Sequence, residues 1–269
     1  MLKPLFLASA FALASLPSHA DEALLKAAVA SGHRTVANVA RDAARNPVST
    51  LSFFGVKPTD TVVELSPGAG GWYTEILAPY LREKGQLIAA ADDPASTTAF
   101  AARSAARFAA KLGAMGVYDK VKLAVFDAAN GKLDLAPAGS VDKVLTFRNV
   151  HNWMPGGEDK TRAVFAAAFA ALKSGGVLGV VEHRLPADRP FDPKAASGYV
   201  HQAYVVKMAE SVGFRFDGSS EVNANPRDTA NHEGGVWSLP PVLRHGAKDR
   251  DRYLAIGESD RMTLRFVKP

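Results

Sequence analysis

A glycine-rich turn carries the most specific chemical signal in the sequence. Residues 62–72 read VVELSPGAGGW, so an apolar run ends at the acid Glu64 and leads into Gly68 and Gly70. Glycine lacks a Cβ atom, takes positive φ angles without strain and lets a ligand approach the backbone closely. A helix that begins after the turn would add backbone N–H groups without partners. We therefore expect this turn to bind a small ligand.

The same turn is a poor match to a dinucleotide site. The pyrophosphate-binding pattern G-x-G-x-x-G/A needs a small residue at its sixth position, where this sequence has Tyr73. The Glu64 carboxylate would also repel a pyrophosphate, whereas it would attract a cationic or amine-bearing ligand. An NAD(P)-dependent oxidoreductase is therefore the least favoured function for such a turn.

Two histidines that follow later apolar runs are the candidates for catalysis. His151 lies in RNVHNW, directly after the run 141–147, and could act as a general base because histidine titrates near neutral pH. A role in packing and hydrogen bonding alone is the alternative. His183 follows Glu182 at the end of the run 177–181. Since neighbouring strand residues point to opposite faces, we expect only one of these two to reach the site.

The cations form two groups that invite opposite interpretations. Arg41 and Arg45 could bind an anionic acceptor, although a surface ion pair with Asp42 is the simpler alternative. A second group lies on one face of an alanine-rich helix and is expected to be solvated: Arg103, Arg107 and Lys111.

No metal site is expected from the spacing of possible ligands. The sequence has seven histidines, and none pairs at His-x-x-x-His or a similarly short spacing. It has no cysteine, which excludes disulfides, thiolate ligands and thiol redox chemistry.

The elements that must position these residues alternate between strands and helices. Apolar runs predict strands at 61–66, 86–91, 121–126, 141–147, 177–181, 214–221 and 262–267. Helical periodicity covers 22–45, 71–83, 95–114, 158–173 and 197–212. Such alternation is typical of an α/β protein with a mainly parallel sheet and helices on both faces. Residues 223–259 have no clear period and are expected to form a lid or an unrecognised element.

With these motifs in place, the sequence resembles the class I S-adenosylmethionine-dependent methyltransferases. Their first motif, E/D-x-G-x-G-x-G, stands here as ELSPGAG, with Ser66 in place of the first glycine and forced into its backbone shape. The segment QLIAAADD is similar to the second strand with its ribose-binding acid, Asp92, and VFDA is similar to the motif whose acid, Asp127, bonds the adenine amino group. LKSGGVL resembles the turn before the fifth strand.

The resemblance covers roughly residues 48–269 and implies a fold, a cofactor and a reaction. It implies a Rossmann-like, seven-stranded, mostly parallel sheet with an antiparallel last strand, and a methyltransferase domain at 56–269 preceded by a helical segment at 21–55. S-adenosylmethionine would be the cofactor, held by Glu64, Ser66, Gly68, Gly70, Asp92, Asp127 and Asn149. An unidentified small-molecule acceptor would contact Tyr73, Arg148 and Trp153. A non-catalytic protein that binds a nucleoside or other small ligand on the same fold is the alternative.

The N-terminal sequence indicates where the protein is located, and the overall charge indicates which partners it could bind. MLKPLFLASAFALASLPSHA has one cation, an apolar run and a small-residue end, which is typical of a signal peptide cleaved after Ala20. The run is too short for a stable membrane span, so we expect an exported, periplasmic protein, with an uncleaved anchor as the alternative. The net charge of +5 is dispersed, and the absence of a basic tract with interleaved aromatic residues argues against nucleic-acid binding. The sequence leaves the oligomeric state open.

Overall fold

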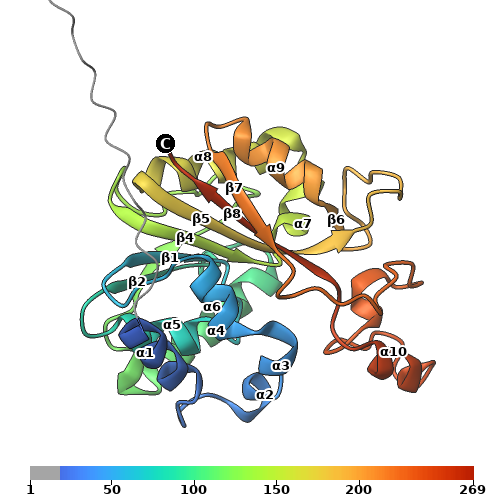
Figure 1. Cartoon of the computed structure of the whole chain (residues 1–269), viewed down its shortest axis with the longest axis horizontal. Helices are drawn as coiled ribbons and strands as arrows, with labels where there is room; N and C mark the ends of the chain where they lie inside the picture. Colours follow the sequence, from blue (N-terminus) through green and yellow to red (C-terminus); the bar gives the residue numbers. More distant parts are fainter. Residues whose placement is uncertain (1–18) are drawn as a thin grey trace, which may run out of the picture.

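A single twisted sheet organises the computed structural model, which describes residues 19–269 (Figure 1). The strand order is β3-β2-β1-β4-β5-β8-β7, and the short strand β6 pairs with β5. Their bounds are β1 (Thr61–Leu65), β2 (Gln86–Ala91), β3 (Lys122–Val125), β4 (Val141–Phe147), β5 (Leu172–Leu185), β6 (Val200–His201), β7 (Arg215–Ser220) and β8 (Arg261–Val267). Strand β8 runs antiparallel to both β5 and β7, whereas β1 to β5 pair in parallel. The predicted α/β fold with an antiparallel last strand is confirmed.

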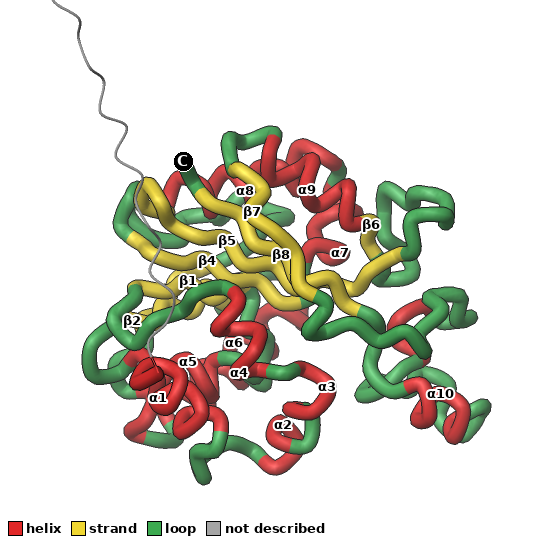
Figure 2. Tube along the Cα trace, viewed as in Figure 1, coloured by secondary structure: helices red, strands yellow, loops and turns green. Residues whose placement is uncertain are grey.

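Helices cover both faces of the sheet, as Figure 2 shows. They are α1 (His19–Val29), α2 (Val36–Val39), α3 (Asp42–Arg45), α4 (Pro47–Phe53), α5 (Thr74–Leu81), α6 (Ala99–Gly113), α7 (Val150–Trp153), α8 (Glu158–Ala171), α9 (Gln202–Glu210) and α10 (Arg250–Ile256). Three short 3-10 helices occupy Gly116–Tyr118, Met154–Gly156 and Gly235–Ser238. Within residues 19–269, no helix combines the length and the apolarity that a membrane crossing requires.

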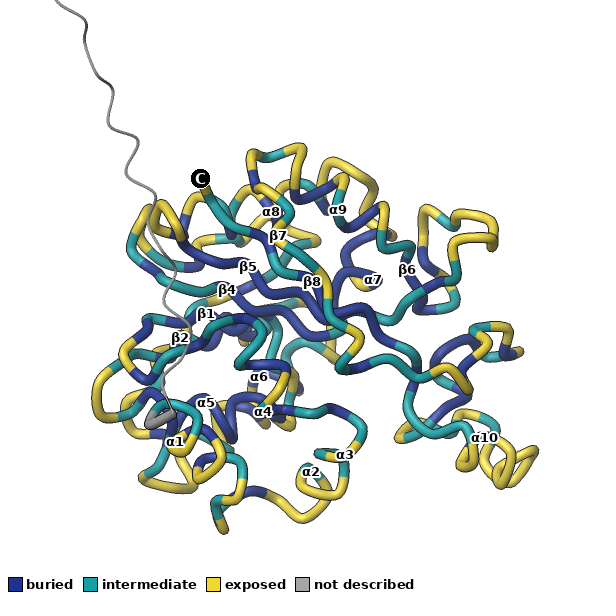
Figure 3. The backbone as a smooth tube through the Cα atoms, viewed as in Figure 1, coloured by how far each residue is buried: buried dark blue, intermediate teal, exposed yellow. Residues whose placement is uncertain are grey.

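Side-chain alternation along the central strands builds the two halves of the core. Val63 and Val144 pack towards α8 and α9, whereas Val62 and Leu145 pack towards α1, α4 and α5. Because both faces are covered, these strands read as nearly continuous apolar runs. Figure 3 shows the buried strands between the two helical layers. The carboxyl ends of β1 to β4 are thereby fixed side by side.

The N-terminal segment differs from its prediction. Instead of one helix over 22–45, three short helices and a break at 30–35 precede α4. The break is held by side chains, because Arg34 donates to the carbonyl of Val29 at 2.7 Å and to Asp42 at 2.7 and 2.8 Å. Asp42 therefore pairs with Arg34, and the predicted surface pair with Arg41 or Arg45 is wrong. The predicted signal peptide falls almost wholly outside the described residues.

Candidate functional site

A cavity of about 610 Å³ lies where β1 to β4 end. Its wall contains six of the residues predicted to bind the cofactor or the acceptor: Ser66, Gly68, Asp92, Asp127, Asn149 and Trp153. These residues come from four separate strand ends, which the parallel pairing of β2, β1 and β4 and of β2 with β3 brings to one edge. The topological switch of an open parallel sheet is where such folds bind ligands.

The glycine turn has a left-handed backbone at two positions that line this cavity. Ser66 has φ 47° and Gly68 has φ 67°, so the serine does adopt the left-handed backbone that a glycine takes more easily. A Cβ atom added to Gly68 would meet nothing within 4 Å, which leaves open space for a ligand.

The second glycine of the turn is a different one from that predicted. Gly71, with φ 52°, takes the positive angle that we expected at Gly70, and a Cβ there would lie 2.9 Å from the ring of Phe108 in α6. Gly71 thus permits close packing of the turn against α6. Gly70 does not line the cavity wall, and its carbonyl faces the side chain of Asn38 at 3.5 Å.

Glu64, near the end of β1, connects the glycine turn to the start of α5. Its carboxylate accepts a hydrogen bond of 2.7 Å from the hydroxyl of Thr74, the first residue of α5, and is 2% exposed. Burial raises the pKa of Glu64 to about 7, against the lowering effects of Thr74 and of the Arg148 charge. Glu64 lies behind the cavity wall, so any effect on a ligand passes through the position of the turn.

The two acids that follow β2 both line the cavity but differ in their partners. Asp93 is engaged, because it accepts from the backbone N–H of Ala95 at 2.8 Å and pairs with Lys132, whose hydrogen bond lowers the pKa of Asp93. Within residues 19–269 the Asp92 carboxylate forms neither a hydrogen bond nor an ion pair, although it lines the cavity. Asp92 is therefore the acid available to ligand hydroxyls.

The remaining cavity residues are held by local hydrogen bonds. Asp127 accepts from the backbone and side-chain amides of Asn130 at 3.1 and 2.7 Å, and a carboxylate has further acceptor capacity. The side-chain amide of Asn149 donates to the carbonyl of Leu65 at 3.0 Å and to Thr146 at 3.1 Å, which ties the ends of β1 and β4 together.

Helix α6 also contributes to the cavity wall, which the sequence did not lead us to expect. Phe100, Arg103 and Arg107 line it, and both arginines are exposed. Their exposure agrees with the predicted solvated face, and it places them along the cavity as well. Lys111, on the same row, pairs instead with the buried Glu75 at 2.5 Å.

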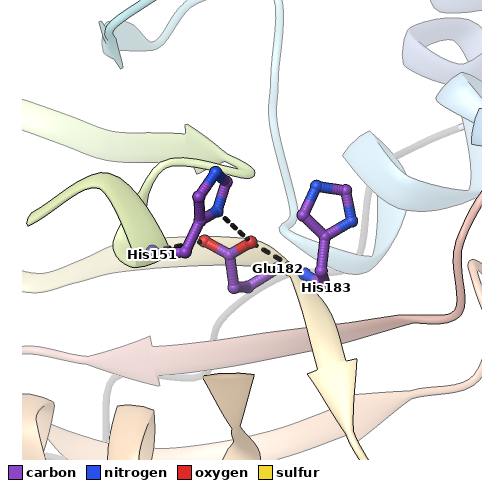
Figure 4. Close-up of side chains that lie close together, drawn as sticks. All are labelled: His151, Glu182 and His183. Carbon is purple, nitrogen blue, oxygen red and sulfur yellow. Dashed lines mark hydrogen bonds and ion pairs between the residues drawn. The ribbon is translucent and has the colours of Figure 1, made fainter. Parts of the chain in front are cut away.

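A buried histidine–carboxylate pair links α7 to β5 (Figure 4), and its two side chains are not among those that line the cavity. The Nδ1 atom of His151 is 3.0 Å from Oε1 of Glu182, and the backbone N–H of His183 donates to the same oxygen at 2.8 Å. A carboxylate oxygen of Glu182 can accept a hydrogen bond from Nδ1–H of His151, and in that tautomer Nε2 is the free ring nitrogen. His151 follows Asn149 and precedes Asn152, and both of these line the cavity.

His183 joins this pair, contrary to the expectation that only one residue of Glu182 and His183 would reach it. The rings of His151 and His183 are 5.3 Å apart, and the Glu182 carboxylate accepts a hydrogen bond from the backbone N–H of His183. Burial, then the charges of His151 and Arg148, lower the pKa of His183 well below 6.5. Its Nδ1 lies 2.6 Å from the hydroxyl of Ser259.

The segment 223–259, whose role the sequence left open, packs against both histidines. The ring of Trp237 meets His151 edge-on, with centroids 6.1 Å apart, and Ser259 bonds His183. No periodic pattern could have placed these residues at the site.

The trio of His151, Glu182 and His183 has a geometry that could ligate a metal ion. Their ligand atoms lie within 4.8 Å of one another, although the sequence places them up to 32 positions apart, beyond a search for short spacings. Both oxygens of Glu182 already accept hydrogen bonds, two from backbone N–H groups and one from His151. With both oxygens engaged, the Glu182 carboxylate is better suited to orienting the His151 imidazole than to binding a metal ion.

Tyr73 and Arg148 lie away from the cavity wall. The Tyr73 ring is buried and stacks on Phe147, with centroids 3.4 Å apart. Arg148 is partly buried at the end of β4, where its charge acts on Glu64, Tyr73 and His183. The predicted acceptor contacts are thus divided between the cavity, with Trp153, and an interior region around Arg148.

Comparison with solved structures identifies the fold. The chain is similar to a SAM-dependent methyltransferase from Aquifex aeolicus, with 16% identity, a TM-score of 0.55 and 93% of this chain aligned to 99% of that one. It is also similar to a putative sarcosine dimethylglycine methyltransferase from Galdieria sulphuraria, with 13% identity, a TM-score of 0.55 and coverage of 87% and 88%. The [4+2]-cyclase SpnF matches at 17% identity, with a TM-score of 0.57 and 93% of each chain covered.

The chain therefore has the Rossmann-like fold of the class I methyltransferases. No protein-family profile and no curated protein sequence matches it. The cyclase among the similar structures illustrates that a fold does not determine a reaction, which must be argued from the side chains of the site.

Proposed function

We propose that this protein is an S-adenosylmethionine-dependent methyltransferase that acts on a small-molecule acceptor. The observation that carries the proposal is the gathering of Ser66, Gly68, Asp92, Asp127 and Asn149 around one cavity at the switch point of this fold. The likeness of the fold to solved methyltransferases supports the proposal. The sequence motif that predicted these residues, which is a methyltransferase motif, supports it as well.

Two features of the cavity fit this cofactor. The space beyond the Cα atom of Gly68 is open, as close approach of a ligand to the turn requires. The unpartnered Asp92 carboxylate is suited to two adjacent ribose hydroxyls, and Asp127 and Asn149 would receive the adenine amino group and the amino-acid end. When bound, S-adenosylmethionine would supply an electrophilic methyl group on a sulfonium centre.

The protein's own contribution to the chemistry is positioning and proton transfer. Glu182 holds His151 in one orientation and one tautomer through the 3.0 Å contact at Nδ1. His151 Nε2 can then accept the proton that an alcohol, phenol or amine acceptor loses when its oxygen or nitrogen attacks. His183, whose pKa is lowered chiefly by burial, stays neutral beside it and adds no competing charge.

Calorimetric titration with S-adenosylhomocysteine tests the cofactor assignment. We expect saturable binding that Asp92→Asn weakens, whereas Asp93→Asn, which alters an acid already engaged by Lys132, leaves the affinity nearly unchanged. Absence of binding to the wild-type protein would refute the proposal.

A screen for transfer of a labelled methyl group from S-adenosylmethionine to an envelope extract tests catalysis. His151→Gln should retain affinity for S-adenosylhomocysteine but lose roughly 10²–10⁴-fold in turnover, the usual contribution of a general base. A His151→Gln enzyme with wild-type turnover would remove His151 from the mechanism.

A non-catalytic ligand-binding protein is the second candidate. The likeness to a [4+2]-cyclase shows that this fold is not confined to methyl transfer, which keeps other uses of the cavity open. Binding of S-adenosylhomocysteine without methyl consumption by any acceptor would favour this candidate.

We also propose that the protein is exported and that its leader is removed after Ala20. The supporting feature is the composition of residues 1–20 alone. Export would separate the enzyme from cofactor made in the cytosol. N-terminal sequencing of the protein from an envelope fraction tests the proposed cleavage directly. An intact leader in a cytosolic fraction would contradict it.

A further inference from the structure

Four arginines that converge beside the histidine pair are an unusual feature of the interior. Arg41 and Arg45 come from the α2–α3 region, Arg148 from the end of β4 and Arg261 from the start of β8. We refer to them as the arginine cluster. Its carboxylate partner is Glu258, which lies 2.6 Å from Arg41, 3.4 Å from Arg45 and 3.2 Å from Arg261. Glu258 thus pairs with three of the four arginines, while Asp260 acts on Arg261 and the Arg148 charge acts on Glu64.

The buried members of the arginine cluster are incompletely satisfied. Arg45 is 2% exposed and Arg261 is 3% exposed. The Nη1 atom of Arg45 is buried and lacks a hydrogen-bond partner within the described residues. For Arg148, the same 251-residue stretch from 19 to 269 supplies no hydrogen bond or ion pair to its guanidinium. The Arg148 guanidinium and Nη1 of Arg45 therefore lack an internal acceptor within the described residues.

The internal charge balance is unfavourable without an anion. Burial, and then the Arg148 charge, lower the pKa of Arg45 to about 8. Burial, and then Arg261, lower the pKa of Arg148 to about 10. The guanidinium of Arg45 gains some stabilisation from the face of Trp72, 4.8 Å away, but a ring carries no net negative charge. An oxyanion would compensate the excess directly.

The arginine cluster adjoins the proposed reaction centre. The charges of Arg148, Arg261 and Arg45 all act on His183, whose ring is 5.3 Å from that of His151. The same three charges act on the phenol of Tyr73. A second cavity, of about 300 Å³, is lined in part by Asn46, Glu258 and Arg261.

We propose that the arginine cluster binds an oxyanion of the methyl acceptor, a carboxylate or a phosphate group, and so orients the acceptor towards His151. This inference rests on the proposed methyl transfer in one respect only, namely that the bound oxyanion belongs to the methyl acceptor. The planar guanidinium of Arg148 can hold two oxygens of such a group at once, which a lysine could not. A cation at this place would be repelled, which also argues against a metal at the neighbouring histidines.

Thermal unfolding with added anions provides the test. Phosphate and benzoate are titrated separately at constant ionic strength, with chloride as the reference salt, against the wild-type protein, Arg148→Gln and Arg82→Gln. Arg82 is a matched surface arginine, paired with Asp119 at 2.7 Å on another part of the molecule. We expect saturable stabilisation of the wild type by one of the two anions, which identifies the kind of group.

Arg148→Gln should weaken that response at least tenfold, whereas Arg82→Gln should respond like the wild type. Arg45→Gln serves as a second variant, and circular dichroism checks that each variant is folded. An anion response unchanged in both Arg148→Gln and Arg45→Gln, or no saturable response in the wild type, would overturn the inference.

Titration of the same proteins with S-adenosylhomocysteine separates the two proposals. Arg148→Gln with normal S-adenosylhomocysteine affinity but a lost anion response supports both. A wild type that binds the anion but not S-adenosylhomocysteine retains the oxyanion site and refutes the methyltransferase assignment.

Discussion

Replacing Glu64 with glutamine should change how the stability of this protein depends on pH. The side chain is buried and accepts a hydrogen bond from Thr74, and a glutamine oxygen can accept that bond equally well. Burial raises the pKa of Glu64 from its ordinary 4.5 to about 7 in the folded state. The folded protein therefore holds a proton that the unfolded chain has released between these two pH values.

The sign and the size of the effect follow from this proton. The contribution of Glu64 to stability is fully present below pH 4.5 and is lost as the pH rises towards and through about 7. The interval corresponds to roughly 3 kcal/mol, at about 1.4 kcal/mol per pH unit. Glu64→Gln stays neutral, so relative to the wild type it should gain roughly 3 kcal/mol between pH 4.5 and pH 8.

Urea unfolding at several pH values, followed by circular dichroism, measures this difference. Other titrating groups are common to both proteins and largely cancel in the comparison. Glu83→Gln, an exposed carboxylate paired with Arg82, serves as the control and should parallel the wild type. If the wild type and Glu64→Gln show parallel dependence of the unfolding free energy on pH, the buried carboxylate has no such proton and the account of Glu64 fails.

Three further variants test the cavity and the charge balance. Gly68→Val should lower S-adenosylhomocysteine affinity at least tenfold, because its side chain enters open cavity space at φ 67°, with roughly 1–2 kcal/mol of backbone strain; calorimetry with undiminished affinity would contradict this. Asp92→Asn should weaken that binding by about 1–3 kcal/mol, and equal weakening by Asp93→Asn would show that the wrong acid was chosen. Glu258→Gln should destabilise the fold by roughly 3–5 kcal/mol in thermal or urea unfolding, since it removes the carboxylate of the arginine cluster; a stability like that of the wild type would mean that the cluster tolerates its charge.

The strands and the cavity could be predicted because local sequence determines them. The runs 86–91 and 141–147 coincide with β2 and β4, since strands buried on both faces must be apolar throughout. Parallel pairing then brings every strand-to-helix turn to one edge, so Gly68, Asp92 and Asp127 meet there without further information. The helix break at 30–35 escaped prediction because it depends on Arg34, whose partners become apparent only in the folded chain.

The catalytic side of the site lies beyond such reasoning for a physical reason. The contact of His151 with Glu182 and that of Arg45 with Glu258 join residues separated by 31 and 213 positions, respectively. No sequence periodicity links such partners. Buried ionisable groups are also rare, so residue propensities for burial do not predict which of them pair. These groups are nevertheless what distinguishes one reaction from another on a shared fold, because they determine which acceptor is held and where its proton goes. Chemistry at the acceptor side must therefore be inferred from unmet charges and hydrogen bonds, which here favour a histidine base oriented by Glu182 and an anionic acceptor.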